Sequence, residues 1–398
     1  MIHIEELMAL LEQSGCKPYY VGGCVRDHLL GLEPADYDIT VSALPDRICT
    51  VLREAGLCPG TDGIKYGTVT VGSAQGLIEI TTHRKDGSYS DSRRPDTVEF
   101  TQLLSEDLER RDFTVNAMAQ SSDGQIIDPF GGQKDLENRT LRCVGDPKVR
   151  FSEDALRMLR AARFAAKLGF EPDPLLLDGM KSCADKAAAL SDTRVGVELV
   201  GMWLSPEPEK GFELLLETGV WKKLFPGFTP SVDVAKVKTM PLSLTSRLSY
   251  LLWGQTTSAV YAFLRRMSVP KNLFDDILLV STAESIELRP DPPFVRRQIR
   301  TYGDLILSVL DVRQARGEDV LSFRQIAEKE LADHVCVTLS RLDISGDDLI
   351  DAGIPAGRGI GVTLSYLLDR VMDDPELNTH ETLLSLALDF AKKEGYCF

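Results

Sequence analysis

Two aspartates separated by a single residue are the strongest candidates for chemistry in this sequence. Asp36 and Asp38 flank Tyr37 in the stretch DYDITV, which predicts a β-strand. Because residues i and i+2 of a strand point to the same face, the two carboxylates are expected to converge. Like charges held this close are costly unless a cation lies between them, and Mg²⁺ binds carboxylate oxygens together with substrate phosphates. The pair therefore indicates metal-assisted transfer chemistry, although an Asp-x-Asp at a loop edge is commonly only solvated.

A glycine pair and a glutamate add to this pattern. Gly22 and Gly23 follow the strand candidate YYV and open a helix, so backbone N–H groups and the positive helix end face outward. Arg26, one turn into that helix, could add a charge-assisted contact to the same anion, although most Gly-Gly pairs are only tight turns. Glu79, in the strand candidate LIEITT, offers a third carboxylate, and an exposed-face acid is the simpler interpretation. The combination is far more specific than any one of its members.

A basic helix is predicted at FSEDALRMLRAARFAAKLGF, residues 151–170. At 100° per residue its apolar side chains fall on one arc, with Asp154 at the edge. The other arc collects the charged side chains, which are Glu153, Arg157, Arg160, Arg163 and Lys167. The pattern alone favours an amphipathic helix whose basic face is solvated.

A second charged motif, ERRDFTVNA, precedes this helix. It contains Arg110, Arg111, Asp112 and Asn116. From the residues alone, a salt-bridged helix end and a nucleotide contact explain the motif equally well.

The composition bounds the class of protein. The chain has 398 residues, more than a single hydrophobic core normally supports, so several domains are expected. Hydrophobic residues make up 43% and charged residues 26%, as in an ordinary soluble globular protein. There is no run of about 18 uncharged apolar residues, and the acidic start MIHIEELMALLEQSGC is unlike a signal peptide, so a cytoplasmic location is expected. The eight cysteines are scattered without a C-x-x-C pair, which argues against a zinc site or a disulfide framework.

The net charge of −15 argues against indiscriminate binding to nucleic acid or to an anionic membrane. Residues 139–170 reverse this sign, with eight Lys and Arg residues against three acids, so a local basic groove is possible. Three further basic clusters, FVRRQIR at 294–300 and the lysine pairs at 222–223 and 392–393, could contact RNA phosphates or could be ordinary solvated groups.

Two kinds of architecture must position these residues. Residues 1 to about 130 mix helix and strand signals, with a helix from about Glu5 to Gln13, the strand YYV, and a helix through Leu30. A further helix starts near Leu44–Pro45, GTVTVG and LIEITT indicate a hairpin, and TVEF and IIDPF add strand candidates. From about Ser152 the pattern is helical nearly to the end. The expected fold class is α+β, with a small mixed β-sheet head followed by an all-α neck, body and tail.

Several motifs, in order over about residues 19–170, resemble a known family. They are GGCVRD, DYD, IEITTHRKDGSYSDSRRPDTVEF, EDLERRDFTVNAMA, DPFGGQKDL and FSEDALRMLRAARF. These segments are similar to class II tRNA nucleotidyltransferases of the DNA polymerase β-like superfamily, the CCA-adding enzymes. A weaker similarity, to the tail of the single-polypeptide bacterial enzymes, occurs at DISGDDLIDAGIPAGRGIGVTLSYLLDRVM.

The resemblance implies template-independent addition of C, C and A to the 3′ end of tRNA from CTP and ATP, with release of pyrophosphate. It implies a catalytic nucleotidyltransferase head at 1–130, a base-selecting neck at 131–205, a helical body at 206–320 and a tRNA-binding tail at 321–398. The implied partners are the tRNA acceptor end, CTP and ATP. No membrane and no protein partner is indicated.

The resemblance also implies roles for single residues. Catalysis would rest on Asp36, Asp38 and Glu79, with Mg²⁺ on Asp36 and Asp38. The implied nucleotide-binding residues are Gly22, Gly23, Arg26, Arg111, Asp112, Asn116, Asp154, Arg157, Arg160 and Arg163. Among these, Asp112 and Asn116 would read the ribose, because a 2′-OH both donates and accepts.

Asp154 and Arg157 match the family motif that selects the incoming base. Cytosine and adenine both present an amino donor beside a ring-nitrogen acceptor, which suits an aspartate acceptor and an arginine donor. Uracil and guanine present the reverse pattern and would leave both protein groups unpaired, at about 1–3 kcal/mol each. Arg160 and Arg163 would then hold the base or the triphosphate.

The polar segment RKDGSYSDSRRPD, residues 84–96, lies between two strand candidates, and its composition alone allows a hairpin connection. The resemblance implies a flexible element that lets the pocket switch from C to A and that is shortened in CC-only enzymes. The alternatives are a poly(A) polymerase, a CC-only or A-only enzyme and, in another class, a noncatalytic RNA- or nucleotide-binding protein.

Overall fold

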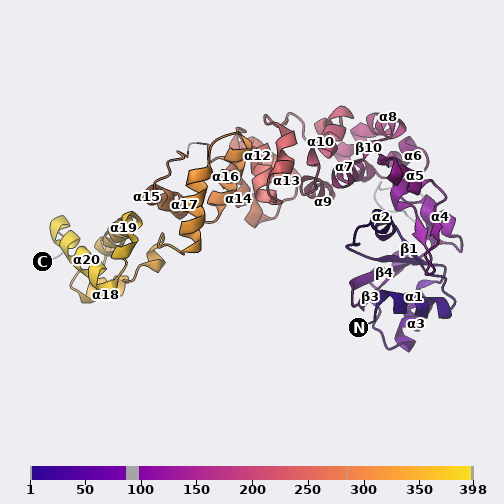
Figure 1. The fold of residues 1–398 in the computed structure, drawn as a ribbon, viewed down its shortest axis with the longest axis horizontal. Helices are drawn as coiled ribbons and strands as arrows, with labels where there is room; N and C mark the ends of the chain where they lie inside the picture. Colours follow the sequence, from indigo (N-terminus) through magenta and orange to yellow (C-terminus); the bar gives the residue numbers. More distant parts are fainter. Residues whose placement is uncertain (1, 87–97, 285, 396–398) are drawn as a thin grey trace. The chain divides into compact units, whose positions relative to one another are not determined.

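The computed structural model describes residues 2–86, 98–284 and 286–395. The chain divides into two compact units (Figure 1), Met1–Thr229 with Arg265–Ser268 and Pro230–Leu264 with Val269–Phe398. In the described part of the chain, no helix has the length and apolar character needed to cross a membrane. The boundaries of head, neck, body and tail stay a prediction.

The first unit contains a mixed sheet of six described strands in the order β3-β4-β2-β1-β7-β8. Their bounds are β1 Tyr19–Val21, β2 Asp38–Val41, β3 Thr68–Ser73, β4 Gly76–Thr82, β7 Ala119–Gln120 and β8 Ile126–Ile127. β2 and β4 pair in parallel, and the expected hairpin is confirmed as the antiparallel pair β3–β4. Two small pairs complete the described strands: β5 Arg84–Asp86 with β6 Val98–Phe100, and β9 Thr140–Leu141 with β10 Glu171–Pro172.

The helices of the first unit confirm the predicted change from mixed helix and strand in the head to a mostly helical chain after it. They are α1 Ile4–Gln13, α2 Gly23–Leu29, α3 Pro45–Glu54, α4 Leu104–Glu109, α5 Gly132–Glu137, α6 Pro147–Glu153, α7 Leu156–Leu168, α8 Pro174–Cys183, α9 Asp192–Trp203, α10 Pro208–Glu217 and α11 Val220–Leu224. A short 3₁₀ segment, η2 Thr114–Asn116, lies between α4 and β7.

Alternation along β2 and β4 separates the two faces of the head sheet. Every second residue of these strands is buried in a core shared with α1 and α3, namely Ile39, Val41, Ile78 and Ile80. Because successive side chains point to opposite faces, Asp38 and Glu79 lie on the other face. The hydrophobic pattern thus fixes where the carboxylates point.

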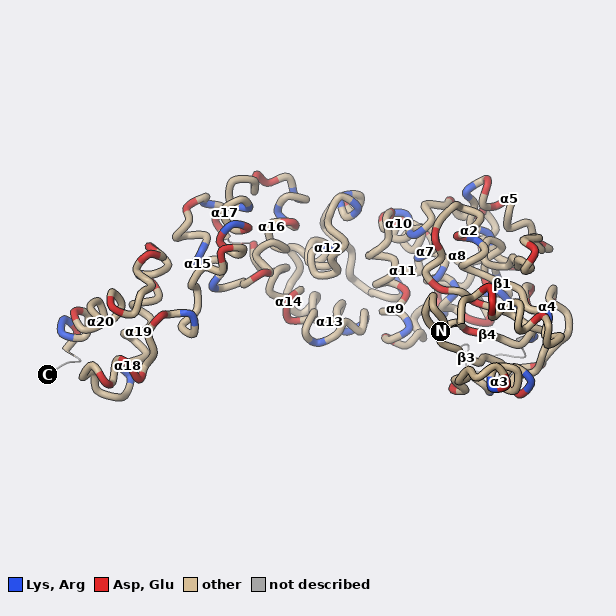
Figure 2. Tube along the Cα trace, turned by 60° about the horizontal axis from the view of Figure 1, so that its bottom comes forward, with Lys and Arg blue, Asp and Glu red and all other residues tan. Residues whose placement is uncertain are grey.

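The second unit is helical in its described residues. Its helices are α12 Leu244–Leu251, α13 Thr257–Arg266, α14 Lys271–Ser281, α15 Pro292–Tyr302, α16 Leu305–Ala315, α17 Leu321–Ala332, α18 Gly346–Asp351, α19 Arg358–Asp373 and α20 His380–Glu394. Acidic and basic positions are interspersed along these helices (Figure 2). The apolar faces of α18, α19 and α20 share one core cluster.

Candidate active site

A cavity of about 700 Å³ in the first unit brings most of the predicted site residues together. All of them except Glu79 line it, joined by Arg110, Leu156, Phe164 and Lys167. Seven Lys and Arg side chains and four Asp side chains face this space, so it is locally basic in a chain whose net charge is −15. Its size and charge suit a nucleoside triphosphate.

The structure corrects one step of the argument for the aspartates. β2 begins at Asp38, so Asp36 lies in the bend before the strand and not on it. The two carboxylates nevertheless line the same cavity, because the bend turns Asp36 toward the face that Asp38 occupies. Glu79 lies beside Asp38 in the parallel β2–β4 register and is exposed.

These three acids influence one another. Burial raises the pKa of Asp38; the Arg111 guanidinium opposes this rise, and the charges of Glu79 and Asp36 add to it. A carboxyl whose charged form is disfavoured by like charges gains from a cation. Among the described residues, no group of three or more His, Cys, Asp or Glu side chains could hold a metal by itself. Two carboxylates completed by substrate phosphate oxygens match the donor set that Mg²⁺ prefers.

The turn at Gly22 is built around Arg111. Gly22 has φ = 76°, a backbone conformation that favours glycine, and a Cβ there would lie 2.8 Å from Arg111 Nη1. Arg111 Nη2 lies 3.4 Å from Asp107 Oδ2, while its buried Nε has no hydrogen-bond partner among the described residues. A buried donor without a partner is costly, and a phosphate oxygen in the cavity would satisfy it.

Arg26, Asn116, Asp112 and Arg160 form a chain of hydrogen bonds along one wall. Arg26 is only 3% exposed and donates to Asn116 Oδ1 at 2.6 Å and to Asp27. Asn116 donates to Asp112 Oδ1 at 3.3 Å, and Arg160 Nε donates to Asp112 Oδ2 at 2.7 Å. Most of these polar atoms are therefore already engaged, which makes the wall rigid.

The predicted single helix at 151–170 is wrong, because the chain breaks at Asp154. α6 ends at Glu153, Asp154 has φ = −142°, and α7 begins at Leu156. The Asp154 carboxylate accepts from the backbone N–H of Leu156 at 3.0 Å and from Arg194 Nη2 at 2.6 Å. Asp154 thus starts a new helix instead of continuing the old one, since aspartate favours such local capping bonds.

The expectation of a solvated basic face is also wrong. Arg157 is buried, and its Nη1 donates to Glu153 Oε2 at 2.6 Å and to the Arg150 carbonyl at 3.2 Å. Glu198 on α9 binds Arg163 Nε at 2.6 Å and lies 3.6 Å from Arg160 Nη1. Lys167 is exposed, as expected.

Three residues of this site were missed by the sequence analysis. Arg194 and Glu198 hold the side chains of the α6–α7 region. Their opposite charges at i and i+4 of α9 were the available signal. Phe164 lines the cavity with three guanidiniums around its ring, from Arg26, Arg160 and Arg163, at 5.4, 5.5 and 4.7 Å from the centroid. Its position between Arg160 and Lys167 on one helical arc was its signal.

Comparisons with known proteins show which family this chain resembles. The family described as Poly A polymerase head domain matches residues 18–142, and that described as probable RNA and SrmB-binding site of polymerase A matches residues 169–231. The CCA-adding enzyme of Levilactobacillus brevis is 33% identical over 96% of this chain and 96% of its own, and that of Geobacillus stearothermophilus is 34% identical over 95% and 94%.

Solved structures show the same fold. The crystal structure of the Bacillus stearothermophilus CCA-adding enzyme in complex with CTP superposes with a TM-score of 0.81 at 29% identity, covering 99% of this chain and 98% of that one. The Thermotoga maritima CCA-adding enzyme complexed with tRNA gives a TM-score of 0.65 at 22% identity, covering 97% and 94%.

Proposed function

Because the chain belongs to the family of CCA-adding enzymes, we propose that it adds C, C and A in turn to the 3′ end of tRNA. CTP and ATP would be the substrates, pyrophosphate the second product, and no nucleic-acid template would be used. The observation that carries this proposal is the single basic cavity that joins Asp36 and Asp38 to Asp154 and Arg157. One open cavity thus offers groups for both transfer and base selection.

Catalysis would consist mainly of positioning and charge neutralisation. Asp36 and Asp38, with Glu79 beside them, would hold Mg²⁺, and the chemistry that this ion would supply is polarisation of the α-phosphate and of the 3′-OH of the tRNA. Arg111, whose buried Nε lacks a partner among the described residues, would bind a phosphate oxygen at the Gly22–Gly23 turn. Arg26 would act through Asn116, which together with Asp112 would face the ribose.

Base selection would rest on Asp154 and Arg157. Each Asp154 oxygen already accepts one hydrogen bond and has a second lone pair for the amino group of cytosine or adenine. Arg157, held by Glu153, would donate to the adjacent ring nitrogen. Arg160 and Arg163, spread around Phe164, would attract the triphosphate or the base.

The wider assignments follow from the same proposal. Residues 131–205 would form the neck that selects the nucleotide, and residues 321–398 would form the tail that binds the tRNA. With tRNA as the substrate, the activity would lie in the cytoplasm.

The test uses a tRNA that ends at its discriminator base. The full chain is incubated with this tRNA, Mg²⁺ and each labelled NTP in turn or in combination, and products are separated on a sequencing gel. We expect two C residues with CTP alone, one further A when ATP is added, and no addition with UTP or GTP. A ladder of A residues would indicate a poly(A) polymerase, and arrest after CC would indicate the CC-only enzyme.

A matched variant separates catalysis from binding. Asp36→Ala combined with Asp38→Ala should abolish transfer of both C and A, while the far-ultraviolet circular dichroism stays unchanged. Turnover by this folded double variant would overturn the catalytic assignment. Nucleotide binding without any turnover by the native chain would indicate the noncatalytic alternative.

A further inference from the structure

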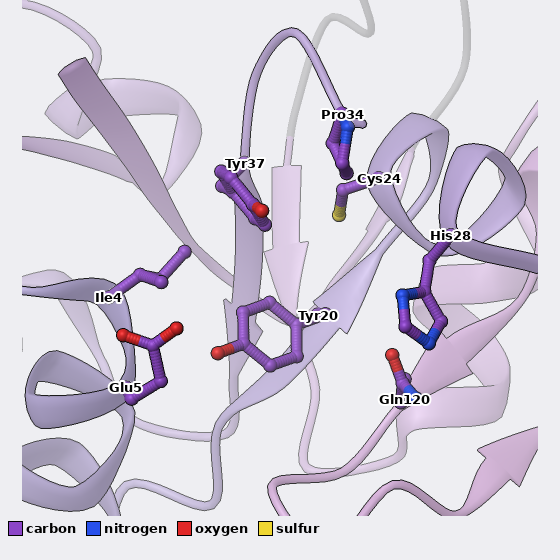
Figure 3. A pocket seen from close by; sticks show the side chains of 8 residues that line it. All are labelled: Ile4, Glu5, Tyr20, Cys24, His28, Pro34, Tyr37 and Gln120. Atoms are coloured by element: carbon purple, nitrogen blue, oxygen red, sulfur yellow. The ribbon is translucent and has the colours of Figure 1, made fainter. Parts of the chain in front are cut away.

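A second, smaller cavity of about 190 Å³ in the head is lined by residues of α1, β1, α2, β7 and the segment before β2 (Figure 3). Tyr20 and Tyr37 line it, and both pack against the core that α1 and α3 share with β2 and β4. Asp36 and Asp38 line the larger cavity instead. Tyr37 therefore lines the smaller cavity, whereas its neighbours Asp36 and Asp38 line the larger one.

Aromatic rings form the body of this small cavity. The ring centroids of Tyr20 and Tyr37 are 6.2 Å apart with an interplanar angle of 59°, so the two rings form a corner. The apolar side chain of Ile4 and the buried thiol of Cys24 also line the space. Tyrosine faces attract cations within about 6 Å of the centroid, more strongly when the cation is desolvated.

The charge at this cavity is negative. Glu5 is the one carboxylate among the lining residues, and no Lys or Arg side chain is found among them. Burial raises the pKa of Tyr20 to about 12, and the Glu5 carboxylate adds to the rise. In Figure 3 Glu5 lies on the hydroxyl side of the Tyr20 ring. Phosphates and carboxylates would therefore be repelled, and a positively charged group would be favoured.

Polar groups here lack protein partners. Glu5 and His28 are exposed, Tyr20 and Tyr37 are half-buried, and none of these side chains forms a hydrogen bond to another described residue. By contrast, the Tyr250 hydroxyl donates to the Asp233 carbonyl at 3.0 Å. These polar groups are therefore hydrated in the free protein and accessible to a ligand, and a concave, largely apolar space with a few polar groups is typical of a ligand site.

We propose that this cavity binds a small organic cation, with its ammonium group against the rings of Tyr20 and Tyr37 and with Glu5 as counter-ion. A cavity of about 150 Å³ accepts benzene, so about 190 Å³ suits a skeleton of roughly seven non-hydrogen atoms. His28 and Gln120, at the other end of the cavity in Figure 3, would form hydrogen bonds with a hydroxyl of the same ligand. An occupant would also contact the residue between Asp36 and Asp38, a consequence that rests on the proposed function.

Isothermal titration calorimetry with the full chain tests this site. The probe is choline, and the control is 3,3-dimethyl-1-butanol, a neutral molecule of the same shape, at fixed ionic strength and without Mg²⁺, nucleotide or tRNA. We expect saturable millimolar binding of choline and binding of the neutral analogue that is at least about fivefold weaker. Equal binding of the two probes, or no saturable heat with choline, would overturn the proposal.

Variants locate the binding. Glu5→Gln should weaken choline binding by about threefold or more, and Tyr20→Leu should remove it. Glu54→Gln is the matched control, because Glu54 is exposed in the same head and does not line the cavity. This variant should bind choline with native affinity. If Tyr20→Leu fails to fold, Glu5→Gln decides alone, and native affinity in that variant overturns the site. Because no reaction is measured, these results are independent of whether tRNA addition occurs.

Discussion

Other charged residues hold the proposed base-selecting pair in place. Asp154 accepts from Arg194 at 2.6 Å, and Arg157 donates to Glu153 at 2.6 Å. The side chains of Arg194 and Asp154 are only 17% and 14% exposed, so their ion pair is weakly screened by solvent. The directions of the acceptor and of the donor therefore depend on residues that need not touch the base.

Removing the acceptor should relax base choice. Asp154→Ala should lower the ratio of kcat/KM for CTP over UTP by about tenfold or more, because one discriminating hydrogen bond is removed. Arg194→Ala keeps the Asp154 carboxylate but removes the side chain that orients it. We therefore expect the ratio of kcat/KM for CTP over UTP to fall by only about threefold. Single-nucleotide addition with CTP, UTP and GTP measures these ratios.

Lys167→Ala is the control for that experiment. Lys167 lines the same cavity, is exposed and makes no ion pair among the described residues. Its loss should therefore weaken the binding of all NTPs to the same extent. If Asp154→Ala also lowers kcat/KM equally for every NTP, the residue supports triphosphate binding and does not select the base.

The Asp112–Arg160 pair joins the head to α7 and should make stability depend on pH. Burial alone would raise the pKa of Asp112, but the Arg160 guanidinium holds it below its ordinary value of 3.8. The unfolded chain then binds more protons than the folded chain near and below pH 3.8, so the pair's contribution is complete above that pH and is lost as the pH falls through the folded pKa.

Asp112→Asn should therefore lower the free energy of unfolding by about 2 kcal/mol at pH 7. This difference between the variant and the native chain should shrink below pH 3.8. Urea unfolding in a Trp253→Phe background reports the first unit, since Trp203 and Trp221 then give the fluorescence. Asp62→Asn, at an exposed residue without a hydrogen bond or ion pair in the described part of the chain, should show no such difference. A pH-independent cost for Asp112→Asn would mean that packing, not charge, is lost.

At the scale of elements, the sequence patterns predicted the β3–β4 hairpin and the strand that carries Asp38, but placed Asp36 on that strand and not in the bend before it. Apolar Ile39 and Val41 alternate with Asp38, which predicts both the strand and the face that its carboxylate occupies. The break at Asp154 was not predictable from helical periodicity, because a capping aspartate and a helix-edge aspartate share the same arc. Arg194 and Glu198 could not be assigned either, since their pairing with Asp154 and Arg163 depends on how α9 packs against α7.

β5 connects the segment 84–96 to the nucleotide site. The Arg84 backbone N–H donates to Asp107 Oδ1 at 3.3 Å, and the buried Asp107 carboxylate also binds Arg110 at 2.9 Å and Arg111 at 3.4 Å. Residues 87–97, which include most of the predicted switching element, lie outside the described residues. The flanks β5 and β6 pair with each other, and β5 contacts this acid through the Arg84 backbone.

Deleting Asp86 to Asp91 should leave two C residues added while the terminal A is lost or greatly slowed. The same Asp154–Arg157 pair must meet a pyrimidine and then a larger purine, and loops often control such steps. Products on a tRNA ending at its discriminator base are read on a sequencing gel. The control, Ser88→Ala with Ser90→Ala, keeps the length of the segment and should retain A addition. Normal A addition by the deletion variant would show that the segment is only a connection between two strands.

At the scale of the whole molecule, an acidic protein must bind an acidic substrate through a few local sites. The α15 cluster is a weak candidate, because each arginine has an acidic partner: Arg296 with Glu330 at 2.8 Å, Arg297 with Asp373 at 2.7 Å and Arg300 with Asp369 at 3.2 Å. Two lysine pairs are exposed, one in the last turn of α11 in the first unit and one in the last turn of α20 in the second. Of these four lysines, Lys223 has an acidic partner among the described residues, Asp185 at 2.5 Å.

These pairs allow a test of the proposed tail in which the two variants carry the same net charge. Lys392→Gln with Lys393→Gln and Lys222→Gln with Lys223→Gln each remove two charges from a helix C-terminus, so long-range repulsion and helix-dipole effects are matched. If residues 321–398 bind the tRNA, the α20 variant should raise KM for tRNA by about tenfold. The slope of log K against log salt for tRNA binding should also fall by about one for each phosphate that this variant no longer neutralises. The α11 variant should change KM for tRNA by about twofold at most, and KM for CTP should stay native in both. A larger effect from α11 would assign RNA binding to the first unit.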